Sequence, residues 1–360
     1  MSLNLEIFFA HTSFKWQNNA KRNAGVTCVI IGIRRIDEKN KKILFKENKA
    51  LVVKEINPYL SDTKNAIVQR CSKSISKLPK LSYGNYPGGC TDLILTPSEK
   101  ELLVKKYPQL EKFIKRFVGS QEFIRGQERY CLWFKNINLD NEILQIPEIS
   151  QRIEKVKNTR ISSKDYSLNS LAKRPHQFRD LNETTTNSIL VPIVSSEKRK
   201  YIPIGFVGKD VVIPNSAQVI YDAEPWIFAV LTSKMHMVWV NAVGGKLKTD
   251  YRYSAEICYN TFPFPEINEK QKQNLTSHVY NILEEREKHP EKTMAELYDP
   301  NKMPAGLKKA HQDLDVAIEL CYRSKPFTSD EERLEHLFKL YEEMISKENP
   351  SNNNQPNSNK

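Results

Sequence analysis

The sequence has 360 residues, which is long for a single hydrophobic core and favours two or three structural units. Hydrophobic residues make up 39% and charged residues 27%, and no stretch approaches the length of a membrane span. No signal peptide opens the chain, so a cytoplasmic location is expected. The six cysteines are scattered without a CxxC pair, which argues against a zinc finger or a disulfide framework and predicts no metal site.

The net charge of +12 is unevenly distributed along the chain. Residues 266–345 carry 12 Lys and Arg against 17 Asp and Glu, whereas residues 1–265 hold a net charge of +16. A basic part of this size favours a polyanionic partner. Lys-rich composition also occurs in proteins of AT-rich genomes, so charge alone leaves both interpretations open.

Two apolar, β-rich segments at residues 5–10 and 25–33 predict neighbouring strands. The second has little alternation and is expected to be buried on both faces. A globular domain does not normally begin with two uncovered buried strands. Residues 1–60 are therefore expected to be the terminal strands of a Rossmann-like sheet whose other strands lie upstream, with a charged surface turn over residues 34–49 and an extended segment to Leu60.

Residues 61–265 have a mixed pattern that predicts an α/β unit. Short strands are predicted at 93–95, 130–134, 188–194, 201–207, 211–213 and 218–221, and helices at 98–106, 110–117, 147–157 and 225–243.

After Pro265 the apolar spacing becomes helical throughout. Helices are predicted at 270–288, 304–322 and 329–346, the last with a capping box of Ser329 and Glu332. Residues 266–346 are therefore expected to be a helical bundle, and the polar residues 347–360 a disordered tail. The fold class predicted for the whole chain is mixed α+β.

Short motifs occur in order along nearly the whole chain. They are FAHTSFKWQNNAK at 9–21, SYG at 82–84, FVGSQEF at 117–123, RYCLW at 129–133, VSSEKRKYIP at 194–203, YRYS at 251–254, YNTFPFP at 259–265, LYDP at 297–300, MP at 303–304 and AH at 310–311. Together they resemble the MmeI-type family of restriction–modification enzymes (type IIG/IIL), single chains that cleave DNA and also methylate adenine.

This resemblance implies an upstream nuclease and methyltransferase core, followed by a target-recognition domain and a C-terminal helical domain. It implies S-adenosylmethionine and Mg²⁺ as cofactors of the full-length enzyme. The family's Gly-rich cofactor loop and Asn-Pro-Pro-aromatic motif are not found here, and Asn57-Pro58-Tyr59 is interpreted as a turn. The chain is thus expected to recognise double-stranded DNA, to contain no catalytic residue and to bind no cofactor by itself. Two alternatives remain, a specificity subunit acting in trans and a self-contained DNA-modifying enzyme with a degenerate cofactor loop.

The loop after the first predicted strand matters for methylation, because in adenine methyltransferases a hairpin there supplies an aromatic that stacks on the extruded base. Phe14 and Trp16 are the candidates, with Lys15, Lys21 and Arg22 as phosphate contacts. The alternative is that both aromatics belong to the core.

The segment 244–254 is the candidate for reading bases. Lys248, Asp250 and Arg252 stand at a spacing of two, so an extended chain would present them on one face. Lys and Arg donate to guanine O6 and N7, and Asp accepts from cytosine N4, so Lys248 and Asp250 could read one G·C pair. In the resembled family this neighbourhood is base-specifying; a local ion pair on a solvated strand is the alternative.

The polar run at 195–200 resembles the family's turn between two strands. Its hydroxyls and cations suit phosphate contacts, which position DNA without specifying its sequence. The predicted contacts are Ser195, Ser196, Lys198, Arg199 and Lys200. A solvated charge run is the alternative. His236 and His311 have no partner at ligand spacing; His236 is expected to pack in a buried helix and His311 to lie on a helix face.

Overall fold

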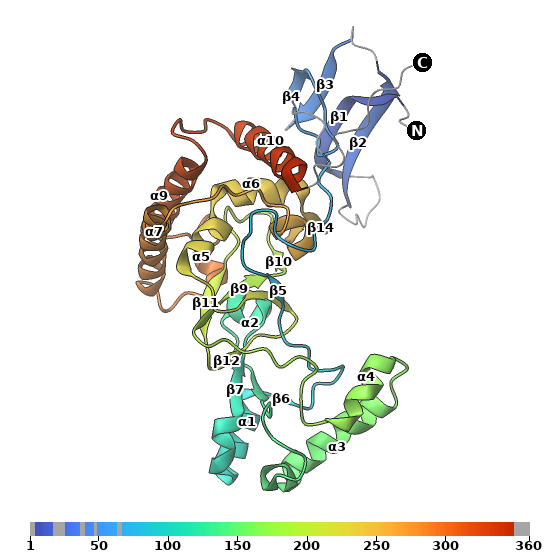
Figure 1. Cartoon of the computed structure of the whole chain (residues 1–360), viewed down its shortest axis with the longest axis vertical. Coiled ribbons are helices and arrows are strands. Elements are labelled where there is room, and N and C mark those ends of the chain that lie inside the picture. The colour runs from blue at the N-terminus through green and yellow to red at the C-terminus, as the bar shows by residue number, and fades with distance from the viewer. Residues whose placement is uncertain (1–3, 17–25, 37–39, 47–48, 63–66, 349–360) are drawn as a thin grey trace.

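The computed structural model describes residues 4–16, 26–36, 40–46, 49–62 and 67–348. The chain is mixed α+β, as predicted, with several small sheets and a group of helices near its C-terminal end. Figure 1 shows an elongated molecule in which the first sheet lies at one end and a small lobe lies at the other. The lobe carries the helices α1 (Pro97–Lys106), α3 (Pro147–Ile161) and α4 (Tyr166–Ser170).

The first sheet has the strand order β2-β1-β3-β4. Its strands are β1 (Leu5–Trp16), β2 (Val26–Arg35), β3 (Lys42–Lys46) and β4 (Lys49–Val53). The two predicted strands are confirmed, and they pair antiparallel. The predicted surface turn over residues 34–49 is wrong. It contains the apolar run 43–45, which pairs parallel with β1 and brings Leu44 into the core.

β2 is the outer strand of this sheet, and the prediction that it is buried on both faces is wrong. Its apolar side chains are between 41% and 61% exposed at Val29, Ile30, Ile31 and Ile33. The physical reason is that the small hydrophobic cluster of this sheet includes no side chain of β2, so in the described part of the chain no layer packs over this strand.

Three further sheets lie within residues 67–265, with the orders β11-β9-β13-β5, β12-β7-β8-β6 and β10-β15-β14. The strands are β5 (Ser82–Tyr83), β6 (Ile94–Leu95), β7 (Ile114–Phe117), β8 (Tyr130–Leu132), β9 (Asn187–Pro192), β10 (Val194–Ser195), β11 (Gly205–Gly208), β12 (Val211–Val212), β13 (Ala217–Ile220), β14 (Gly245–Leu247) and β15 (Asp250–Arg252). All the predicted strands of this unit occur, with shifted ends. The largest shift is at 201–207, where pairing starts only at Gly205.

Two predicted helices of this unit are revised. Residues 110–117 do not form one helix: a 3-10 helix at Pro108–Phe113 leads into β7, which pairs with β8. The predicted helix 225–243 is broken into α5 (Pro225–Thr232) and α6 (Lys234–Val243) by Ser233, which is extended. The Ser233 hydroxyl accepts from His236 N at 3.2 Å, capping α6.

A buried arginine in α3 links several backbone segments of the lobe by hydrogen bonds. The Arg160 side chain, 1% exposed, donates to backbone carbonyls of Pro87, Gly88, Leu171, Arg174 and Gln177. A buried cation without a carboxylate is tolerable when carbonyl dipoles surround it. Arg160 thus fixes the Gly-rich segment 84–89 against the end of α3. The short helix α2 (Ser120–Arg125) contacts β9.

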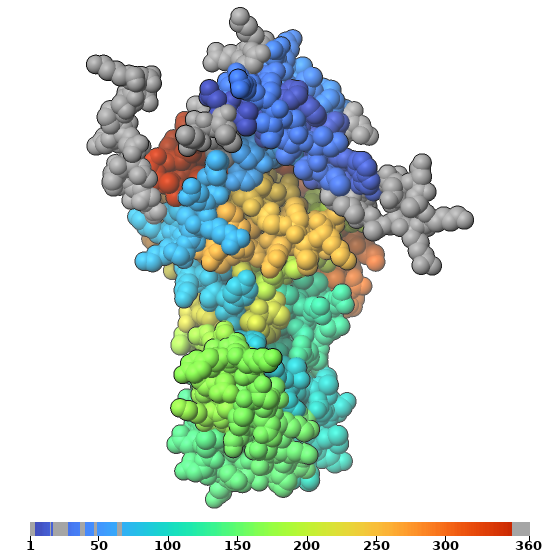
Figure 2. All heavy atoms as spheres, turned by 90° about the vertical axis from the view of Figure 1, so that its right-hand side faces the viewer, coloured from blue at the N-terminus to red at the C-terminus, as the bar shows by residue number. Residues whose placement is uncertain are grey.

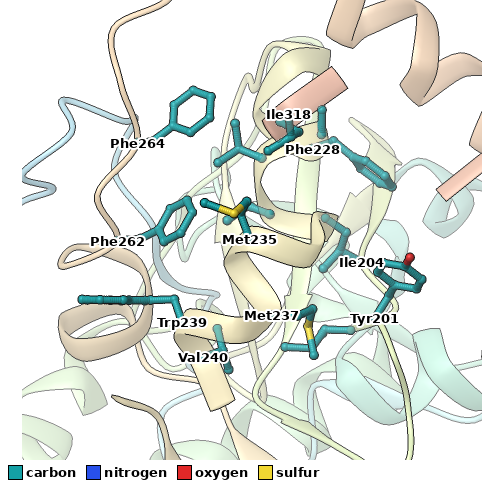
Figure 3. Packing of buried hydrophobic residues seen from close by; sticks show 14 of the residues in the cluster. Tyr201, Ile204, Phe228, Met235, Met237, Trp239, Val240, Phe262, Phe264 and Ile318 are labelled. Carbon is teal, nitrogen blue, oxygen red and sulfur yellow. The ribbon is translucent and has the colours of Figure 1, made fainter. Parts of the chain in front are cut away.

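The three predicted C-terminal helices are confirmed as α7 (Glu269–Glu287), α9 (Ala305–Tyr322) and α10 (Asp330–Glu348), with the short α8 (Met294–Leu297) between the first two. Residues 349–360 of the predicted tail lie outside the described residues. One hydrophobic cluster joins these helices to α5, α6 and the sheet behind them. Figure 3 shows α6 at its centre, with Phe262 and Phe264 on one side and Tyr201 and Ile204 on the other.

Candidate nucleic-acid interface

β14 and β15 form an antiparallel hairpin joined by Lys248 and Thr249. Lys248 has φ 59°, the left-handed conformation that tight hairpin turns use. The other edge of β15 pairs with β10, which completes the small sheet. The expectation that Lys248, Asp250 and Arg252 alternate along one strand is therefore only partly met: Asp250 and Arg252 share a strand, but Lys248 lies in the turn.

The hairpin is open to solvent. Lys248 and Arg252 are exposed and Asp250 is half-buried. Figure 2 shows the amber part of the chain, which includes the hairpin, on one face with the first sheet above it in blue and the lobe below it in green. The first sheet, the hairpin region and the lobe therefore share one face of the molecule.

The polar turn at 195–200 follows β10 directly, so it lies beside the hairpin. Lys198 and Lys200 are exposed and Ser196 is partly exposed. Ser195 is 3% exposed, and its hydroxyl oxygen accepts a hydrogen bond from Arg199 at 3.5 Å. Arg199 is itself half-buried. The predicted group of phosphate contacts thus separates into an exposed set and an inward-facing pair.

The structure brings the two predicted segments into contact. The Glu197 amide donates to Asp250 Oδ1 at 3.2 Å. Burial lowers the pKa of the Arg199 guanidinium, and the negative charges of Asp250 and Asp299 oppose this effect. Burial likewise lowers the pKa of Lys246, opposed by the charges of Glu197 and Asp250. Cationic groups therefore border Asp250 from the turn and from β14.

Glu197, Lys246 and Tyr251 complete this site and were missed in the sequence. Lys246 Nζ lies 3.7 Å from the centroid of the Tyr251 ring, directly across the hairpin, and donates to Asn241 Oδ1 at 3.1 Å. A hairpin turn predicted at residues 248–249 would have placed Lys246 opposite Tyr251. Lys-Thr is not among the residue pairs that predict one.

The candidates for base stacking lie elsewhere, on the first sheet. Phe14 and Trp16 belong to β1 and not to the loop after it, because the strand runs six residues beyond the predicted end. Their rings are 6.3 Å apart, Trp16 is 51% exposed and Phe14 is partly buried. Lys21 and Arg22 lie outside the described residues, as does the side chain of Lys15.

The two histidines considered as metal ligands are buried in hydrogen-bonded pairs. His236 Nε2 lies 2.8 Å from Tyr253 Oη, and His311 Nε2 lies 2.7 Å from Tyr298 Oη. Burial lowers the pKa of both imidazoles, that of His236 to about 3. The prediction of a buried helix for His236 and of a helix face for His311 is confirmed, and His311 is buried as well. Among the described residues, no three His, Cys, Asp or Glu side chains are grouped to hold a metal ion.

These features define a class of protein in which a terminal four-stranded sheet is joined to an α/β unit with an exposed hairpin and to a helical unit. Residues 62–266 match the family described as MmeI, target recognition domain. Residues 267–347 match the MmeI C-terminal domain, and residues 1–46 match the MmeI DNA-methyltransferase domain. The chain belongs to the MmeI family, since the first match alone spans more than half of it, and the resemblance read from the motifs is confirmed.

Two known proteins illustrate the relationship. The chain is 48% identical over 343 residues to DNA methyltransferase A of Bacillus subtilis (strain 168), a match that covers 95% of this chain and 39% of the relative. It is also similar to the solved structure of the type IIL restriction–modification enzyme MmeI in complex with DNA, with a TM-score of 0.86 and 39% identity over 96% of this chain and 47% of that one. The chain spans less than half the length of both. None of its described helices is long and apolar enough to cross a membrane.

Proposed function

We propose that this chain reads a specific sequence in double-stranded DNA for an adenine-N6 methyltransferase of the restriction–modification type. The observation that carries the proposal is the small sheet β10-β15-β14, which presents Asp250 together with exposed cations from two distant segments. The similarity to an enzyme solved with DNA supports it. Exposed Lys198 and Lys200 are suited to phosphates, whose neutralisation supplies most of the sequence-independent affinity.

Base reading is assigned to the hairpin. Lys248 at the turn donates to guanine O6 or N7, Asp250 accepts from the N4 amino group of cytosine, and Arg252 can donate two hydrogen bonds to a second guanine. A β-hairpin fits the major groove, where all four base pairs present different patterns of donors and acceptors.

The test exchanges the two charges. The 360-residue chain is incubated with random DNA duplexes and the bound sequences are determined; Lys248→Glu with Asp250→Arg is expected to change the preferred base pair at one position. A matched control is Lys209→Glu with Asp210→Arg, an exposed Lys–Asp pair in the turn between β11 and β12, which should leave the preference unchanged. An unaltered preference in the hairpin variant would contradict the assignment.

We further propose that the first sheet joins a methyltransferase core, in the same chain or in a separate subunit. The exposed isoleucines of β2 support this, since an exposed apolar edge strand usually pairs with another strand or packs against another domain. In the assembled enzyme Phe14 or Trp16 would stack on the extruded adenine and Lys15, Lys21 and Arg22 would contact its phosphates.

We propose that the first sheet does not bind S-adenosylmethionine by itself, because the family's Gly-rich cofactor loop is not found in this sequence. A hollow of about 780 Å³ in this sheet is bordered by apolar side chains such as Leu5 and Ile33 and by charged ones such as Lys54. Its Lys42 is already paired with Glu6 and Glu55, at 2.9 and 3.0 Å. We therefore assign the cofactor to the methyltransferase core and Mg²⁺ to the nuclease of the whole enzyme. Calorimetry with S-adenosylmethionine tests this: tight binding by the chain alone would favour a self-contained enzyme instead.

A further inference from the structure

Arg199 differs from the lysines on either side of it. Lys198 and Lys200 are exposed, whereas Arg199 is half-buried and turns back to the hydroxyl of buried Ser195. A phosphate contact needs a guanidinium that reaches the surface. The inward direction of this side chain requires another explanation.

The turn that carries Arg199 also holds Asp250. It is closed by a hydrogen bond from Arg199 N to Ser196 O at 3.1 Å. The register of β10 with β15, Ser195 opposite Tyr251, brings the turn alongside Asp250. The Glu197 amide then donates a hydrogen bond to Asp250 Oδ1, while in the described part of the chain Oδ2 accepts no hydrogen bond.

A carboxylate that reads DNA meets an electrostatic problem. B-DNA carries about one negative charge per 1.7 Å of its axis, so an acidic side chain entering a groove is repelled by the phosphates. A cation behind the carboxylate offsets that repulsion, and it does so more effectively when it is partly shielded from solvent. Arg199 occupies such a half-buried position on the turn that binds Asp250, and among the described residues it forms no ion pair within 4 Å with that carboxylate, so its charge acts at longer range.

We propose that Arg199 is a positioning residue for Asp250: its guanidinium, bonded to the Ser195 hydroxyl on the strand beside β15, fixes the turn whose Glu197 amide binds Oδ1. Oδ2 is thereby oriented to accept a hydrogen bond from an exocyclic amino group of a base, and Arg199 contacts no phosphate. This inference rests on the proposed function of the hairpin. It reassigns Arg199 from general DNA affinity to the discrimination of one base pair.

The test compares Arg199→Met with Lys200→Met, which removes an exposed charge next to it. DNA sequences are first selected from random duplexes with the unaltered chain, and affinities for the selected duplex and its single-base variants are then measured at several salt concentrations. Arg199→Met is expected to reduce discrimination about tenfold at the base pair read by Asp250, with the salt slope unchanged. Lys200→Met is expected to weaken binding to all duplexes and to lower the slope by about one unit.

A second comparison separates positioning from a general structural role. In the Asp250→Asn background, Arg199→Met should cause no further loss of discrimination, because its effect acts through the carboxylate. Should Arg199→Met unfold the chain, Arg199→Lys replaces it; this variant keeps the charge but not the planar guanidinium and is expected to retain part of the preference.

The outcomes are distinct. A selection in which the unaltered chain enriches no sequence would overturn the proposed function and this inference with it. A clear selected sequence whose discrimination is unaffected by Arg199→Met overturns the inference alone. A uniform loss of affinity with a smaller salt slope would instead make Arg199 a phosphate contact.

Discussion

The first sheet and the rest of the described chain bury their apolar side chains very differently. The sheet encloses a small cluster of Ala10, Leu44 and Ile56 and leaves β2 exposed. The sheet β11-β9-β13-β5, α5, α6 and the C-terminal helices share one continuous cluster that crosses the boundary near residue 265. The sheet β12-β7-β8-β6 and the lobe have a separate cluster of their own. Between the two regions, Tyr59 stacks on Phe338 with ring centroids 5.3 Å apart, and Lys46 pairs with Glu331. The sheet β11-β9-β13-β5 and the helices packed on it therefore form a single cooperative body, to which the first sheet is an attachment.

Truncation tests this comparison with the largest expected effect. A chain of residues 1–266 loses the buried faces of α7, α9 and α10, a loss that exceeds the 5–15 kcal/mol by which domains are typically stable. We expect any transition that it keeps to be limited to the lobe, which has its own cluster, so that its change in ellipticity on heating is small. A chain of residues 57–360 should retain its full transition, and circular dichroism during heating measures both. A transition of the 1–266 chain that involves nearly all of its ellipticity would show that the shared core is not required.

Single substitutions sharpen the contrast at a smaller scale. Trp239, fully buried in α6, packs on Phe262 and Phe338, and Trp239→Ala should destabilise the protein by about 3–5 kcal/mol in urea titrations. Ile33 is 61% exposed, and Ile33→Ala should change the unfolding free energy by less than about 0.5 kcal/mol. Similar losses in the two variants would mean that β2 is covered in solution.

A dependence of stability on pH is expected where α9 packs against α6 and Tyr201. Asp315 accepts hydrogen bonds from Tyr201 Oη at 2.7 Å and Lys234 N at 2.6 Å. Burial of the carboxylate raises its pKa from 3.8 to about 7, although these hydrogen bonds oppose the shift. The folded protein thus keeps a proton that the unfolded chain has released. Stability should fall as pH rises from about 4 to about 7, by at most about 1.4 kcal/mol per pH unit.

Asp315→Asn removes this titration, so its urea midpoint should change less between pH 5 and pH 8 than that of the unaltered protein. Asp313→Asn, at an ion-paired position near the surface of the same helix, should keep the full dependence. An unchanged pH profile in Asp315→Asn would place the responsible group elsewhere.

The elements that could be predicted from the sequence are those set by neighbouring residues. The C-terminal helices follow from apolar spacing and from caps such as Ser329, whose hydroxyl accepts from Glu332 N. β3 escaped prediction because its short apolar run becomes a strand only by pairing with β1, more than thirty residues earlier. The break at Ser233 was not predicted because apolar residues continue on both sides of it without Gly or Pro to mark a boundary.

The candidate site shows the same limit. The motifs identified both segments, the turn at 195–200 and the hairpin, yet nothing local indicates that Glu197 meets Asp250 across 53 positions. That contact depends on the pairing of β10 with β15. The inward direction of Arg199 follows from the same pairing, so residue type alone could not distinguish it from its exposed neighbours.

The left-handed backbone at Lys248 has a consequence for how specificity can change. Any unbranched side chain at this position meets about the same conformational cost, on the order of 1 kcal/mol. Exchanging lysine for glutamate, glutamine or arginine would therefore alter the chemistry presented to a base while leaving the free energy of unfolding nearly constant. Under the proposed function, this turn lets a lineage acquire a new DNA target without first having to gain stability elsewhere.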